Sequence, residues 1–190
     1  MSNGRTNQKL RTRNEILRAA TDLIRTGRDV TMLEIAKAAL VSEATAYRHF
    51  PDLPSLLAEA MSSQMSAESL AGALDTADPV RRVAIATERL LRHVLTYQGA
   101  VRVMIAATIT RPSAAGNRPG LRFGLIDAAL APLADTLDPA AFAQLKNDLA
   151  VVVSAEALFS LTDLCGLAPQ EAIASAVHTA TTLTRAAVSG

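Results

Sequence analysis

Five side chains that can bind phosphate groups or the edges of bases lie within one stretch of seven residues: Glu43, Thr45, Tyr47, Arg48 and His49. Hydroxyl, guanidinium and imidazole groups donate hydrogen bonds to phosphate oxygens, and a carboxylate accepts one from a cytosine amino group. Ser42 is well placed to cap a helix that begins here and ends before Pro51. The pattern predicts a short helix whose polar groups suit a nucleic-acid groove.

A second short helix is predicted immediately before this one. Thr31 can cap it, and its apolar positions Leu33, Ile35, Ala36 and Ala39 would give it a buried side. Leu40 and Val41 form the turn into the second helix. The segments 32–39 and 42–50 therefore predict a helix-turn-helix motif, with the polar groups on its second helix.

This segment resembles the DNA-binding domain of the TetR family of bacterial transcriptional regulators. The matching residues are the Thr31 cap, IAKAA at 35–39, VS at 41–42, T-x-YRHF at 45–50 and LL at 56–57, preceded by the basic amphipathic stretch RTRNEILRAATDLI at 11–24. The resemblance implies an all-α fold. It implies a helix-turn-helix DNA-binding domain with a basic N-terminal arm at 1–54, and a larger helical domain for effector binding and dimerisation at 55–190.

The resemblance also implies the DNA-contacting residues: Thr31, Ser42, Glu43, Ala44, Thr45, Tyr47, Arg48 and His49. Helix starts at Thr31 and Ser42 would anchor phosphates through free backbone N–H groups. Base reading would fall on Glu43, Ala44 and Thr45. Two alternatives remain open: Tyr47 packs beneath the helix, and Glu43 only favours the helix N-terminus.

The sequence departs from the family pattern in and around the motif. Leu40 occupies the turn position where the family usually has Gly, and a non-Gly residue at positive φ costs on the order of 1 kcal/mol. Leu53 and Pro54 replace a Lys-acidic pair, which removes an expected phosphate contact. Ala46 replaces a larger apolar residue, and Leu33 stands where some members have a base-reading Arg. These changes put the DNA affinity in doubt rather than the fold.

Beyond residue 54 the sequence is helical throughout. Helices are expected at about 55–71, 79–98, 100–110, 121–136, 139–164 and 170–188, with a Pro- and Gly-containing loop at 111–120. Apolar positions recur at helical spacing in the last two: Leu145, Leu149, Val152 and Phe159, then Ile173, Val177, Ala180 and Leu183. The last two helices are predicted to form a homodimer interface; the alternative is that these faces close the chain's own core.

The effector site implied by the resemblance is expected in the helical domain. Met and aromatic residues would give it adaptable apolar walls, and a few polar groups would orient a ligand. The candidate residues are Met65, Arg89, His93, Tyr97, Met104, Thr108, Phe123 and Phe159. Each alone is more often a core or surface residue than a ligand contact.

Composition narrows the remaining functions. The formal net charge is only +1, yet the first 28 residues hold seven basic and two acidic side chains. The single cysteine, Cys165, rules out an internal disulfide and is expected to be a buried apolar residue. No signal peptide or membrane span is expected, so the predicted location is cytoplasmic. No catalytic constellation, cofactor motif or metal-ligand spacing occurs.

The sequence therefore predicts a DNA-binding transcriptional regulator that is not an enzyme. We expect a repressor that binds a palindromic double-stranded operator as a dimer and is released by a small-molecule effector. Two alternatives stay open: a helical interaction protein with weak or no DNA binding, and a small-molecule-binding bundle.

Overall fold

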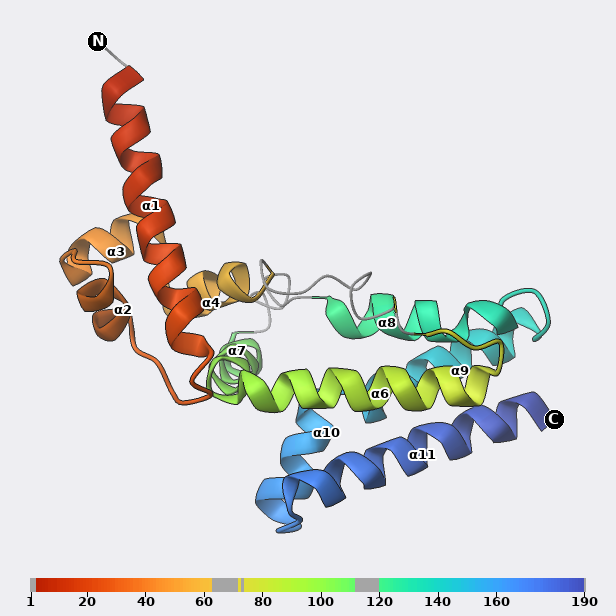
Figure 1. Cartoon of the computed structure of the whole chain (residues 1–190). Helices are drawn as coiled ribbons and strands as arrows, with labels where there is room; N and C mark the ends of the chain where they lie inside the picture. Colours follow the sequence, from red (N-terminus) through yellow and green to blue (C-terminus); the bar gives the residue numbers. More distant parts are fainter. Residues whose placement is uncertain (1–2, 63–71, 73, 112–119, 190) are drawn as a thin grey trace. The chain divides into compact units, whose positions relative to one another are not determined.

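The computed structural model describes residues 3–62, 72, 74–111 and 120–189. Every regular element within these ranges is a helix, which confirms the predicted all-α class (Figure 1). The chain packs as two compact units, one of residues 1–64 with 96–119 and the other of residues 65–95 with 120–190. The units are built from non-contiguous segments, so they do not follow the predicted division at residue 54, which stays a prediction about function.

The first unit holds α1 (Asn3–Ile24), α2 (Met32–Ala38), α3 (Glu43–His49), α4 (Leu53–Ser62) and α7 (Gln98–Thr110). Helix α1 packs against α2 and α4, and α4 also packs against α7. Ile16, Ala20 and Ile24 recur every four residues on α1, so they form one face, and all three are buried. Phe50 and Leu56 complete the same core.

Helix α7 begins against the main chain that links α1 to α2. The backbone N–H of Gly99 donates to the Gly27 carbonyl oxygen at 3.2 Å. A Cβ on Gly99 would lie 2.8 Å from the Asp29 nitrogen and would overlap the Arg28 carbonyl group. Only glycine allows this close backbone approach, so the start of α7 fixes the position of residues 27–29.

The second unit holds α6 (Pro79–Thr96), α8 (Leu121–Leu130), a 3₁₀ turn (Ala131–Leu133), α9 (Pro139–Val152), α10 (Ala155–Phe159), a π-helical turn (Ser160–Leu164) and α11 (Pro169–Ser189). Helix α9 packs against both α8 and α11. The core of the second unit consists of apolar side chains from α6, α8 and α9, among them Leu90, Leu125 and Leu149.

One side chain joins several backbone segments of this unit. The Arg82 guanidinium donates to the carbonyl oxygens of Leu74 at 2.7 Å, Thr76 at 3.0 Å, Ala128 at 2.7 Å and Ala129 at 3.1 Å. Two of these carbonyls belong to the last turn of α8, where a helix has no intrahelical donors. Arg82 therefore caps α8 and holds the start of α6 to it.

The helix predicted over 121–136 is wrong beyond Leu130, where a 3₁₀ turn follows. Helix α6 ends at Thr96 rather than at 98, α7 already begins at Gln98, and α4 begins at Leu53 rather than at 55, while 63–71 lie outside the described residues.

Two differences are larger. Helix α1 starts at Asn3 rather than at residue 11. The single helix predicted over 139–164 is wrong, because Val153 and the extended Ser154 interrupt it. The Ser154 hydroxyl accepts from the Ala157 N–H at 3.0 Å and starts α10 as a new cap. The β-branched run 151–153 favours an ending here, since such side chains lose rotamer freedom in a helix.

Two other expectations about the second unit need correction. Leu145, Leu149 and Ala180 lie in this unit's own core, so these side chains are not a free interface. The homodimer interface through the last two helices stays a prediction. Cys165 is exposed rather than buried, because it follows the π-helical turn at the surface. In the described residues, no helix combines the length and apolarity needed to cross a membrane.

Candidate nucleic-acid interface

The start of α2 is closed by its own side chains. Thr31 is the cap: its hydroxyl accepts from the Glu34 N–H at 3.2 Å and donates to the Glu34 carboxylate at 2.9 Å. That carboxylate also accepts from the Thr31 N–H at 2.9 Å and from Arg28 at 2.7 Å. The Arg28 hydrogen bond, followed by those from Thr31, lowers the pKa of Glu34 to about 2. The Glu34 carboxylate thus occupies the start of α2, where the sequence predicts that backbone N–H groups bind a DNA phosphate.

The turn between α2 and α3 contains the expected left-handed residue. Leu40 has a φ of 56° and is 93% exposed. Its side chain makes little packing contact to offset this conformation, which costs an L-residue about 1–2 kcal/mol. The Val41 N–H donates to the Ala36 carbonyl at 3.0 Å, which closes the end of α2. The departure at Leu40 therefore leaves the turn geometry intact.

Three side chains form a hydrogen-bonded row along α3. The Ser42 hydroxyl accepts from the Thr45 N–H at 3.2 Å and lies 2.8 Å from the Thr45 hydroxyl. The Arg48 guanidinium donates to the same Thr45 hydroxyl at 2.7 Å. The row holds Thr45 and Arg48 in fixed positions on the outer side of the helix. When a phosphate or base binds Thr45, the Thr45 hydroxyl would give up its contact with Ser42 and form a hydrogen bond to the DNA instead.

The remaining groups of α3 divide clearly into inner and outer positions. Ala46 is fully buried and Phe50, at the end of the helix, is 2% exposed. Glu43, Ala44 and Arg48 are exposed, and Tyr47 is 47% exposed. About half of the Tyr47 side chain is therefore open to solvent, and its role as a DNA contact stays a prediction. Ala46 and Phe50 therefore form the buried side of α3.

His49, the last residue of α3, lies in a cationic environment. Its Nδ1 atom is buried and has no hydrogen-bond partner within the described residues. Burial lowers the pKa of His49, and the charges of Lys9, Arg48 and Arg13 lower it further. Arg13 itself is held by Glu59 at 2.5 and 2.6 Å and lies 4.6 Å above the Phe50 ring.

Seven of the predicted DNA-contacting residues therefore lie on α3 or its cap, while Thr31 lies at the start of α2. Sequence reasoning did not single out Lys9, which it counted only as part of a basic segment. The spacing of forty residues between Lys9 and His49 gives no signal, because it depends on how α1 packs beside α3. Leu33, 44% exposed on α2, is a further outward apolar group.

The predicted effector residues fall in different parts of the chain. His93 and Phe159 are buried in the second unit, whereas Arg89 is exposed and Phe123 is 53% exposed there. The remaining described candidates belong to the first unit: Tyr97, Met104 and Thr108. Met65 lies outside the described residues. The effector site stays a prediction.

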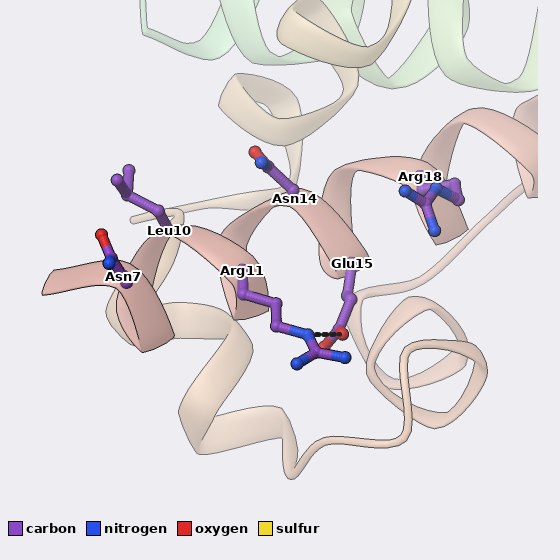
Figure 2. A pocket seen from close by; sticks show the side chains of 6 residues that line it. All are labelled: Asn7, Leu10, Arg11, Asn14, Glu15 and Arg18. Carbon is purple, nitrogen blue, oxygen red and sulfur yellow. Dashed lines mark ion pairs between the residues drawn. The ribbon is translucent and has the colours of Figure 1, made fainter. Parts of the chain in front are cut away.

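A surface hollow lies on one face of α1 and is lined by Asn7, Leu10, Arg11, Asn14, Glu15 and Arg18 (Figure 2). A single helix supplies all of its walls, and Arg11 is paired with Glu15 across it. It contains none of the predicted effector residues. Among the residues described, no three His, Cys, Asp or Glu side chains gather as a metal site.

The fold and the outward groups of α3 define a helix-turn-helix protein of the DNA-binding class. Residues 16–60 match the family model of the bacterial regulatory proteins, tetR family. A solved structure of a TetR transcriptional regulator from Rhodococcus sp. RHA1 is similar, with 22% identity over 92% of this chain and 96% of that one and a TM-score of 0.57. No curated protein sequence matches. The predicted resemblance is confirmed for the helix-turn-helix segment, which matches the tetR family model over residues 16–60, and the similar solved structure shows the same fold over most of the chain.

Proposed function

We propose that this regulator is a repressor that binds a palindromic DNA operator as a homodimer. The observation that carries the proposal is the surface of α3, where Ser42 holds Thr45, Thr45 in turn holds Arg48, and Tyr47 is exposed on the same helix. Fixed donors on a short helix suit a major groove, since they lose little side-chain freedom on binding. One such helix supplies little specificity. Two copies spaced about 34–36 Å apart would read successive major grooves.

The effector part of the proposal follows from linkage. A small molecule releases DNA only if it binds more tightly to a conformation whose two α3 helices are wrongly spaced. We expect an apolar or amphipathic compound in the helical domain, and a cytoplasmic protein. Within the second unit, the buried His93 is the described candidate best suited to supply a polar group to such a site.

Selection of duplexes from random DNA at about physiological salt tests the DNA part. We expect a palindrome with half-sites about one helical turn apart. Tyr47→Phe and Thr45→Ala should then weaken binding about 5- to 20-fold, because each loses a hydrogen bond to DNA. Thr136→Ala, which changes an exposed threonine far along the chain from α3, is the matched control.

Two results would contradict the proposal. Recovery of salt-sensitive background alone would favour the interaction protein without operator recognition. Normal binding by both α3 variants would show that another element reads the DNA. Dimer mass should be unchanged in each variant, so any loss of binding cannot be assigned to dissociation.

A further inference from the structure

Helix α3, which carries the outward polar groups, is held by few contacts of its own. It has seven residues, and Ala46 is the buried side chain among them. About two turns of helix are not stable alone in water, so tertiary contacts set where α3 lies and how it is rotated about its axis. Phe50 ends the helix: its ring is buried, and its N–H donates to the Ala46 carbonyl at 2.9 Å. The rotation of α3 therefore depends mainly on Ala46 and on what holds the Phe50 ring.

The Phe50 ring is held by Arg13. The Arg13 guanidinium lies 4.6 Å from the centre of the ring, and it donates to both carboxylate oxygens of Glu59 at 2.5 and 2.6 Å. Arg13 belongs to α1, which packs against both α3 and α4, and Glu59 belongs to α4 (Figure 1). A two-pronged pair of this kind fixes the plane of the guanidinium, and a planar guanidinium stacks on an aromatic ring. One side chain thus joins the end of α3 to two longer helices.

A small rotation of α3 is enough to disturb the reading of base edges. The outer atoms of a helix lie about 5–6 Å from its axis, so a rotation of roughly 10° moves them by about 1 Å. Thr45 and Arg48, on the outer side of α3, would move by this amount. Binding groups must be held to within about 0.5 Å, whereas attraction between charges falls only slowly with distance. A loose α3 would therefore lose sequence recognition before it lost general attraction to DNA.

The Arg13–Glu59 pair is itself neutral, so it adds no net charge to the DNA-binding surface. We propose that Arg13 is a positioning residue for sequence recognition: its paired hydrogen bonds to Glu59 and its stacking on Phe50 fix the rotation of α3. The ratio of operator affinity to affinity for other DNA then depends on Arg13, although Arg13 does not contact DNA. This inference rests on the proposed DNA-binding function.

Arg13→Lys is the sharpest test. The lysine keeps the charge and can still pair with Glu59, but it lacks both the two-pronged hydrogen bond and the flat stacking surface. Arg11→Lys is the matched control, because it makes the same change on the same helix at a side chain that is 83% exposed. Affinity is measured for the duplex recovered by selection and for a scrambled duplex of equal length, over a range of salt, well below the melting temperature of each variant.

Arg13→Lys should weaken operator binding by about 3- to 10-fold, which corresponds to the loss of the stacking and of one charged hydrogen bond. Affinity for the scrambled duplex and the salt slope should stay at the wild-type values, since no charge changes. Glu59→Gln should lower the ratio of operator to scrambled affinity in the same way. Arg11→Lys should change none of these quantities.

Two further measurements separate positioning from a general loss of stability. Amide hydrogen exchange in residues 43–50 should be about 3- to 10-fold faster in Arg13→Lys without DNA, while exchange in α11 stays unchanged. Arg82→Lys weakens contacts between α6 and α8 in the second unit and should keep the wild-type affinity ratio. An equally lowered ratio in Arg82→Lys would show that stability alone explains the effect, and unchanged exchange in α3 would show that other contacts hold this helix. Either result would overturn the inference.

The two duplexes also distinguish this inference from the proposed function. If the wild-type protein bound both duplexes equally, operator recognition would be wrong, and the inference would be wrong with it. If the wild-type protein preferred the operator and Arg13→Lys preferred it to the same degree, the proposed function would stand and this inference alone would be wrong.

Discussion

Gly99→Ala tests the backbone contact between α7 and the linker that follows α1. The new Cβ would lie 2.8 Å from the Asp29 nitrogen and would overlap the Arg28 carbonyl, whereas unstrained contacts between heavy atoms are about 3.5–4.0 Å. Both neighbours are main-chain atoms, so no side chain can rotate away. Either residues 27–29 or the start of α7 must move by about 1 Å.

The magnitude follows from two losses. Overpacking of this kind costs about 1–3 kcal/mol. The displaced Gly99 N–H also loses its 3.2 Å hydrogen bond to the Gly27 carbonyl, worth about 0.5–1.5 kcal/mol. We expect the free energy of unfolding to fall by about 2–4 kcal/mol, which lowers Tm by roughly 5–15 °C in a chain of this length.

The displacement should also reach the DNA-binding surface. Arg28 lies in the shifted linker and pairs with Glu34 in the cap of α2, so movement there disturbs the helix that supports α3. DNA affinity should fall together with Tm. Differential scanning calorimetry and duplex titration measure the two effects.

Gly120→Ala is the matched control for this substitution. Gly120 has a φ of −76°, which alanine adopts freely, and nothing lies within 4 Å of its added Cβ. The free energy of unfolding of the Gly120→Ala variant should stay within about 1 kcal/mol of the wild-type value. If Gly99→Ala proved no less stable than Gly120→Ala, the contact would not hold the linker as reasoned.

Three further substitutions give independent tests. Leu40→Gly should stabilise the protein by about 1 kcal/mol in urea unfolding, because glycine adopts the positive φ without strain and removal of the exposed leucine side chain costs little packing. A loss of stability would mean that the Leu40 side chain contributes more packing than its exposure indicates. Arg82→Ala should cost about 2–4 kcal/mol, since four carbonyls lose a charged donor, while the exposed neighbour in Arg81→Ala should change stability by less than about 0.5 kcal/mol. Glu34 contributes stability that is fully present above its unfolded pKa of about 4.5 and is lost as the pH falls toward its folded pKa of about 2. Thermal melts of Glu34→Gln and the wild type should therefore differ at pH 6 and converge near pH 2; a constant difference would refute the linkage.

Local signals predicted the motif well. The caps at Thr31 and Ser42 are confirmed because each depends on residues within a few positions of one another. Such features are decided by backbone sterics and short hydrogen bonds, which a sequence displays directly. The positive φ at Leu40 was expected only from the resemblance, in which the family usually has Gly at this position.

Other features depended on contacts that spacing does not reveal. The extension of α1 has no apolar side, so periodicity could not indicate a helix from Asn3. The continuous apolar pattern favours one long helix through residue 154, whereas the Ser154 side chain favours the start of a new helix by capping it. The structure has the new helix. The apolar face at Leu145 and Leu149 was consistent with a core or an interface, because burial within one chain and burial between two give the same pattern.

The exposed end of α1 also has a consequence for the speed with which this protein reaches DNA. With a net charge of +1, the chain as a whole is hardly attracted to a polyanion, yet its first 28 residues concentrate seven basic side chains against two acidic ones. In the field of a duplex this asymmetry exerts a torque that turns the α1 end toward the phosphates before contact. More collisions are then productive, and the association rate constant should fall steeply with ionic strength even though the molecule is almost neutral. Orientation in the encounter complex, rather than long-range attraction of the whole molecule, governs how fast its search along DNA begins.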